Sequence, residues 1–208
     1  MNAADFLDGV RQAQQTELSR LGSSKSLYAD TEGEMDEDTV LAAVADVFYH
    51  AHATFDIWTD AEVGGPAGDL FYETAGLIGE QYGTVASEFE DHDPDAPSPV
   101  IEYLQGLDTT PERVAGVIGW ALVVENKISQ AVGFFVGQAS PQTASTFRDV
   151  RDAVESLVDD AADTLVDVCD SDADEDLAHE AAVDTIQAAY DDYFDTLEEL
   201  GVNPKPVC

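Results

Sequence analysis

The sequence predicts an all-α fold, a single helical-bundle domain that spans residues 1–208. Apolar residues recur at three- and four-residue spacing through most of the chain, which is the period of an amphipathic helix. No segment alternates apolar and polar residues as a half-buried strand does. A chain of 208 residues with 44% hydrophobic content can also bury one substantial core.

Capping residues mark the first three predicted helices. Asn2 begins a helix that we expect to run to about Tyr28, and Asp36 begins one that ends near Asp60. Pro66 begins the third, which we expect to end near Glu90, where the acidic residues and prolines of FEDHDPDAPSPV break the pattern.

The remaining helices follow a long connection, in which VIEYLQGL predicts a short helical turn. Thr110 with Pro111, and Ser140 with Pro141, each match a cap followed by proline at the first helical position. Gly201 closes the last helix. About six helices joined mostly by short links predict antiparallel neighbours in a bundle.

The helix predicted over residues 111–138 is apolar on almost all sides, so we expect it to be the central one. Its glycines would let neighbouring backbones approach closely; they are Gly116, Gly119, Gly133 and Gly137.

Charge is the most unusual property of the composition. The chain has 44 acidic and 8 basic residues, a formal net charge of -36. In molar salt the Debye length falls to roughly 3 Å, which removes most of the repulsion between carboxylates. Together with a lysine content limited to Lys25, Lys127 and Lys205, this charge is typical of an extreme halophile. It disfavours nucleic-acid binding, because no basic cluster is present to neutralise phosphates.

The cysteines and the N-terminal residues predict a cytoplasmic, soluble protein. Cys169 and Cys208 have no CxxC partner or ligand-like spacing, so we interpret them as free thiols in a reducing compartment. MNAADFLDGVRQ lacks the apolar core of a signal peptide, and no apolar run reaches the ~20 residues of a membrane span.

Two carboxylates are candidate metal ligands. Glu125 is the only acidic residue within VIGWALVVENKISQAVGFF, and Glu17 is in line with apolar residues of the first helix. A buried carboxylate must be paired, protonated or bound to a metal, because an isolated buried charge costs several kcal/mol. The alternative is structural pairing inside the bundle, for example with Arg20, Lys25 or Lys127.

Histidines add two more candidate ligands, His50 and His52. They cannot chelate together on one helix, because residues two apart diverge by about 200°. A hydrogen-bonded core histidine is the alternative interpretation. His92, in the acidic connection, is expected to be solvent-exposed. Asp176 and His179 form a D-x-x-H pair that chance explains in so acidic a segment.

Three stretches resemble a known family: TELSRLGSSKSLYA (16–29), VGFFVGQASPQTASTFR (132–148) and YDDYFDTLEELGVNPKPVC (190–208). They look like haloarchaeal proteins classed as rubrerythrin-like, within the ferritin-like superfamily. The resemblance spans nearly the whole chain and implies a ferritin-like bundle. It also implies a di-metal site, which in such bundles takes Glu from two helices and Glu-x-x-His from two others.

The chain departs from that pattern at the ligands. No Glu-x-x-His occurs, and the third helix has Ile78 and Gln81 where the resemblance leads us to expect one. Isoleucine donates nothing and a neutral amide is a weak ligand. The rubredoxin-type iron centre of rubrerythrin needs four cysteines and is excluded by a count of two.

The sequence leaves two main functions open. One is a metalloprotein that binds iron or another transition metal through Glu17, His50, His52 and Glu125, with a redox-protection or metal-handling role. The other is a non-metallated binding or interaction protein that kept the bundle and lost the di-iron site. No catalytic residue is assigned, since no nucleophile or phosphate-loop signature is present. A homodimer is expected if the six striped helices leave one face uncovered.

Overall fold

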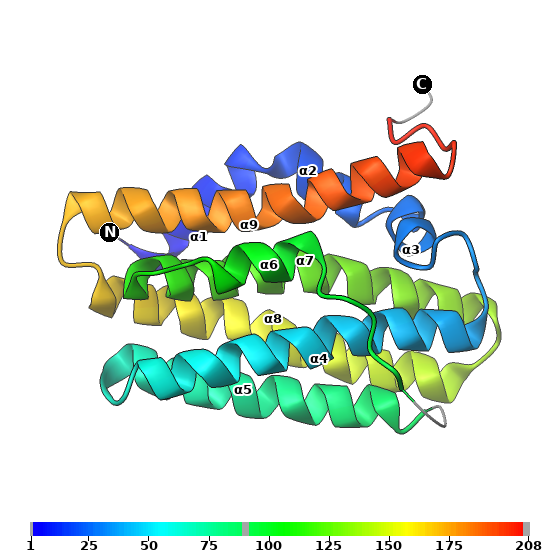
Figure 1. Ribbon diagram of the computed structural model, residues 1–208, viewed down its shortest axis with the longest axis horizontal. Helices are drawn as coiled ribbons and strands as arrows, with labels where there is room; N and C mark the ends of the chain where they lie inside the picture. Colours follow the sequence, from blue (N-terminus) through cyan, green and yellow to red (C-terminus); the bar gives the residue numbers. More distant parts are fainter. Residues whose placement is uncertain (1, 89–91, 206–208) are drawn as a thin grey trace.

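Every regular element in the described part of the chain is a helix. The computed structural model describes residues 2–88 and 92–205 (Figure 1). The helices are α1 (Ala3–Ala13), α2 (Gln15–Leu21), α3 (Ser24–Asp30), α4 (Glu37–Ala61), α5 (Gly65–Ala86), α6 (Pro99–Gln105), α7 (Thr110–Gly137), α8 (Pro141–Val168) and α9 (Asp172–Glu199). The all-α class is confirmed, with nine helices in the described ranges instead of about six.

The extra helices come mainly from the N-terminal segment, where one helix was predicted. Gln14 leaves the helical conformation at φ -112° and ψ 27°, and Ser23 is extended at φ -101° and ψ 161°. Between them, Gly22 lies so close to α7 that an added Cβ would be 2.6 Å from Asn126 Oδ1. The segment therefore bends to follow the bundle, which a single straight helix could not do.

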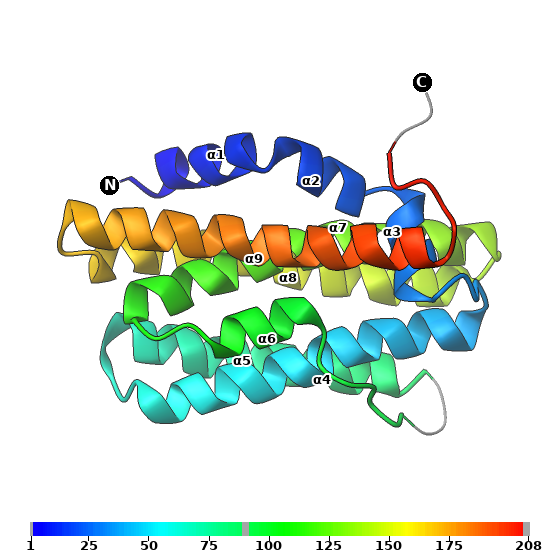
Figure 2. The same ribbon diagram turned by 45° about the horizontal axis from the view of Figure 1, so that its top comes forward.

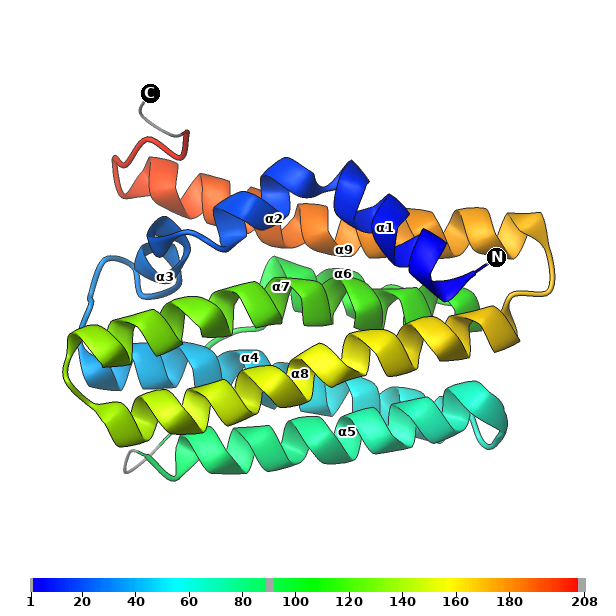
Figure 3. The same cartoon turned by 180° about the vertical axis from the view of Figure 1, so that it is seen from behind.

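Helices α4, α5, α8 and α7 contact one another in a closed ring and form a four-helix core (Figure 3). Their starts agree well with the caps in the sequence. The Asp36 side chain accepts from Thr39 N at the start of α4, as predicted. At α7 the cap is Thr109, one residue earlier than predicted, in a complete capping box with Glu112.

The connection between α5 and α7 gives the core its topology. Helices α4 and α5 are antiparallel, and so are α7 and α8, whereas α5 and α7 run in the same direction (Figure 1). The described part of the connection, residues 92–109, therefore returns along the length of α4. It contains α6, the short helix predicted in VIEYLQGL.

Helix α9 packs outside the core against α7 (Figure 2). Helices α1 and α2 lie along α9 and also contact α8 and α7, respectively. Helices α3 and α6 each contact both α4 and α9, and so bridge two helices that are not major neighbours. No helix in the described ranges has the length and apolar character needed to span a membrane.

Helix α7 is the central helix, as predicted, and every residue from Val114 to Val124 is buried. Its glycines serve different purposes. An added Cβ at Gly119 would be 2.7 Å from Ala182 O of α9, so that glycine sets a close helix contact. At Gly133 and Gly137 nothing lies within 4 Å of an added Cβ, so the predicted close approach does not occur there.

Candidate functional site

The interior of the four-helix core is apolar. Trp120 of α7 is fully buried, and Phe48 and Phe55 of α4 pack edge-on against its ring at centroid distances of 6.2 and 5.3 Å. Ile78 of α5 is also fully buried. Among the described residues, the buried polar ones carry only hydroxyl or amide groups: Gln14, Ser26, Thr31, Thr54, Thr74 and Thr185.

Glu125 lies at the edge of the core and not in its centre. Its side chain is partly buried, and this desolvation raises its pKa. The neighbouring Glu155 of α8 raises the pKa further, while Arg11 and Arg151 oppose the shift. The carboxylate therefore faces α8 and α1, among charged groups that need no metal.

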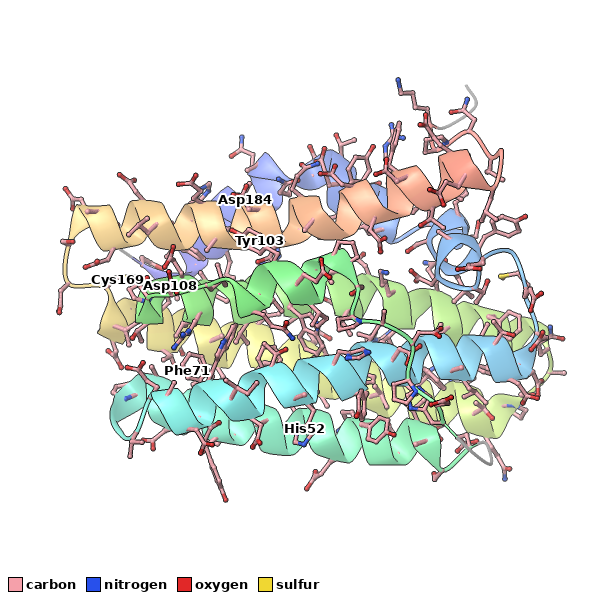
Figure 4. All side chains as sticks on the ribbon, in the orientation of Figure 1. His52, Phe71, Tyr103, Asp108, Cys169 and Asp184 are labelled. Carbon is pink, nitrogen blue, oxygen red and sulfur yellow. The ribbon has the colours of Figure 1, made fainter. Side chains whose placement is uncertain are left out.

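The two candidate histidines bond to separate backbone carbonyls. His50 Nε2 donates to Asp95 O at 2.8 Å, and His52 Nδ1 donates to Ala75 O of α5 at 3.0 Å. His52 lies between α4 and α5, as its label shows (Figure 4). These bonds fit the alternative of hydrogen-bonded structural histidines.

Glu17, on α2, is partly exposed and belongs to an element that lies outside the four-helix core. The basic residues considered as inner partners for the candidate carboxylates are engaged elsewhere. Arg20 Nη1 donates to Pro204 O at 2.9 Å, and Lys25 Nζ donates to Asn203 O at 2.7 Å. Glu17 and Glu125 are thus not held together by either cation.

The prediction that His92 is solvent-exposed is wrong. Its side chain is only 5% accessible, and Nε2 donates to Asp46 Oδ1 at 2.9 Å. Its Nδ1 is 3.1 Å from the Tyr82 hydroxyl. The same Asp46 oxygen accepts from Asp95 N at 3.2 Å. An acidic loop predicts exposure, but here the loop returns along α4 and buries its histidine between two helices.

The structure does contain a partly open cavity of about 250 Å³ outside the four-helix core. Its lining residues come from α4, α9 and α7 and from the α3 and α6 segments that bridge α4 and α9. Apolar lining comes mainly from Val47, Ile101, Trp120, Val123, Val124 and Ala189. The sequence could not reveal this cavity, since its walls come from five separate helices.

The polar groups of the cavity are mostly acidic. Four carboxylates line it, Asp30, Glu32, Asp46 and Asp192, together with the single ammonium of Lys127. Lys127 Nζ is 2.5 Å from Asp30 Oδ1. His50 also lines the cavity.

Burial acts on two of these carboxylates. It raises the pKa of Asp192, an effect that Lys127 opposes and that Asp30 and Asp195 reinforce. Burial also raises the pKa of Asp46, although its bonds to Asp95 N and His92 lower it. Asp30, Asp46 and Asp192 were not predicted from the sequence as site residues. The one feature of the sequence that could have indicated this site is Lys127, a charged residue within an apolar helix. It was considered only as a partner for Glu125.

A partly buried polar pair lies between α6 and α9. Tyr103 of α6 and Asp184 of α9 face one another (Figure 4). Burial raises the pKa of Tyr103 to about 12, and the nearby carboxylate of Asp184 adds to the shift. The phenol therefore stays neutral and acts as a structural contact between α6 and α9.

The residues do not fit the di-metal centre that a ferritin-like fold implies. Within the described ranges, no group of three or more His, Cys, Asp and Glu side chains is arranged to hold a metal ion. The buried positions of α4, α5, α7 and α8 hold mainly aromatic and aliphatic side chains, with Thr54 and Thr74 contributing hydroxyl groups. A di-metal centre needs carboxylate and imidazole donors there.

Comparisons with known proteins identify no family for this chain. The chain matches no protein-family model, no curated protein and no solved structure. Any functional conclusion therefore depends on the site itself.

Proposed function

We propose that this protein is a ferritin-like helical bundle of a halophile that binds a small molecule in the cavity between α4 and α9, without a di-metal centre. The observation that carries the proposal is a contrast between two interiors. The four-helix core is filled by Trp120, Phe48, Phe55 and other apolar side chains. The cavity beside it is concave, partly open to solvent and lined by charged groups as well as apolar ones.

The order and direction of the helices support the proposal of a ferritin-like fold. Four-helix bundles with one long crossover are characteristic of ferritin-like folds, and α5 and α7 are joined by such a connection. Fold alone does not determine function, however. The binding role therefore rests on the cavity, because ligand sites are typically concave, mostly apolar and supplied with a few convergent polar groups.

The charge supports function in concentrated salt. A net charge of -36 on 208 residues destabilises a compact state when the charges are poorly screened. Carboxylates are absent from the fully buried positions of the described residues, so this charge lies at or near the surface. Salt can screen charges in that location most effectively.

The experiment combines metal analysis with analysis of co-purifying small molecules, both on protein isolated in molar KCl. We expect substoichiometric iron, manganese and zinc, with no difference between wild type and Glu125→Gln. We also expect a small molecule to be extracted from wild type in near-equimolar amount. Ala43→Leu, which fills the cavity from α4, should remove it.

Ala42→Leu is the matched control, because the same side chain is added to the neighbouring residue of α4, which does not line the cavity. A stoichiometric metal that is lost in Glu125→Gln would contradict the proposal and favour the metalloprotein function. Equal recovery of the small molecule from Ala43→Leu and Ala42→Leu would place its binding elsewhere and would also contradict the proposal.

A further inference from the structure

We infer that the cavity takes a small organic cation, an amine with an apolar body. This inference rests on the proposed binding function and specifies the chemical class of the ligand. It follows from the balance of charge in the cavity, from the character of its α7 wall and from its size.

The charge balance favours a cation. Four carboxylates face one ammonium, and that ammonium is paired with Asp30. Asp46 on α4 is already bonded to His92 Nε2 and Asp95 N, so Asp192 on α9 is the carboxylate that a ligand can pair with. A carboxylate removed from water is stabilised by an opposite charge within reach. A ligand ammonium group would supply that charge, whereas an anionic ligand would add to the repulsion.

The apolar surface of the α7 wall favours an organic ligand over a metal ion. Trp120, Val123 and Val124 present carbon surface to the cavity. A hydrated metal ion would leave this surface in contact with water, while the apolar body of an amine would cover it.

The size of the cavity limits the ligand. A cavity of about 150 Å³ accommodates benzene, so the present 250 Å³ corresponds to a ligand of about ten non-hydrogen atoms. Arylalkylamines of this size are suitable probes. 2-Phenylethylamine has both the ammonium and the apolar body, and 2-phenylethanol has the same size without the charge.

The test is calorimetric titration of the full-length protein in molar KCl with each probe. We expect the amine to bind at least about tenfold more tightly than the alcohol, as hydrogen bonds to charged groups contribute more than neutral ones. Asp192→Asn should weaken amine binding about tenfold and leave alcohol binding unchanged. Glu198→Gln is the control, because it removes one carboxylate from an exposed position of α9 that does not line the cavity.

The outcomes separate this inference from the function on which it depends. If the alcohol binds as well as the amine, the cavity accepts neutral ligands; the cation inference is then wrong and the binding function stands. If Asp192→Asn and Glu198→Gln weaken amine binding equally, the effect comes from net charge, which also overturns the inference. If neither probe binds and no small molecule co-purifies, both the inference and the proposed function fail.

Discussion

His92 Nε2 donates a hydrogen bond to Asp46 Oδ1 at 2.9 Å, and this bond ties the connection between α5 and α7 to the side of α4. Asp46 accepts a second bond from Asp95 N, three residues further along the same connection. His50, one turn along α4 from Asp46, donates to the carbonyl of Asp95. Two side chains of α4 thus fix the backbone that borders the cavity at Ala96 and Ser98.

Removing His92 should therefore destabilise the fold more than its position in an acidic loop predicts. We expect His92→Ala to lower the free energy of unfolding by about 1.5 kcal/mol, because it leaves the partly buried Asp46 carboxylate with one partner fewer. Asp93→Ala, at an exposed neighbour, should change it by less than about 0.5 kcal/mol. Urea unfolding in molar KCl measures both. If both substitutions lowered the free energy of unfolding equally, the hydrogen bond between His92 and Asp46 would make no specific contribution to stability.

Glu125→Gln should stabilise the protein near neutral pH. Burial and Glu155 raise the pKa of Glu125 in the folded state, so the folded protein binds this proton more tightly than the unfolded chain does. Ionisation then costs stability as pH rises through the ordinary carboxyl range to the raised pKa. We expect a gain of about 0.5 kcal/mol at neutral pH, comparable to one weak surface charge interaction.

The pH dependence provides the check on that prediction. Below the ordinary pKa of a glutamate, Glu125 is protonated in both states, so the advantage of Glu125→Gln should disappear there. Unfolding curves of both proteins across acidic and neutral pH would show this convergence. A difference that stays constant at all pH values would mean that packing, and not charge, is responsible.

Two glycines of α7 should respond in opposite ways to alanine. At Gly119 the new methyl group would meet Ala182 O and the Thr185 side chain at under 3 Å, so α7 and α9 would have to separate. We expect Gly119→Ala to lower the free energy of unfolding by about 2 kcal/mol. Gly133→Ala meets nothing within 4 Å and should raise it by roughly 0.5 kcal/mol through helix propensity. Thermal unfolding at one salt concentration distinguishes the two, and a stabilising Gly119→Ala would refute the close contact.

Salt should stabilise the folded state strongly between 0.1 M and 1 M KCl, because the Debye length falls from about 10 Å to about 3 Å. One acidic cluster offers a specific test. Asp56, Glu73 and Glu80 surround a surface groove between α4 and α5, and all three are exposed. Replacing them with Asn, Gln and Gln should raise stability at low salt and reduce its salt dependence. An unchanged slope of stability against salt would contradict the repulsion argument.

The sequence was sufficient for features that depend on local chemistry. Asp36 caps α4, Pro141 begins α8, and the apolar helix around Trp120 is central. These predictions succeeded because caps, proline and helical periodicity act over a few residues. The N-terminal segment was predicted as one helix, although Gly22 and Ser23 are residue types that commonly interrupt helices; Gly22 ends α2 and Ser23 is extended.

The candidate site was harder to predict from the sequence. A partly buried glutamate looks the same in sequence whether it faces a metal, an arginine or solvent, and Glu125 is explained only by Glu155, Arg11 and Arg151 from other helices. The Lys127 pair with Asp30 joins residues 97 positions apart. Such pairings depend on the packing of whole helices, which a single sequence does not specify.

The position of α7 also affects the order in which the chain can fold during synthesis. Its main neighbours, α8 and α9, both follow it in the sequence, whereas α4 and α5 form an antiparallel pair that is complete before α7 begins. The ribosome therefore releases the apolar stretch from Val114 to Val124 before the helices that cover it exist. Exposed apolar surface of this kind promotes aggregation of unfinished chains. The nascent protein is thus most vulnerable between the completion of α7 and the emergence of α9.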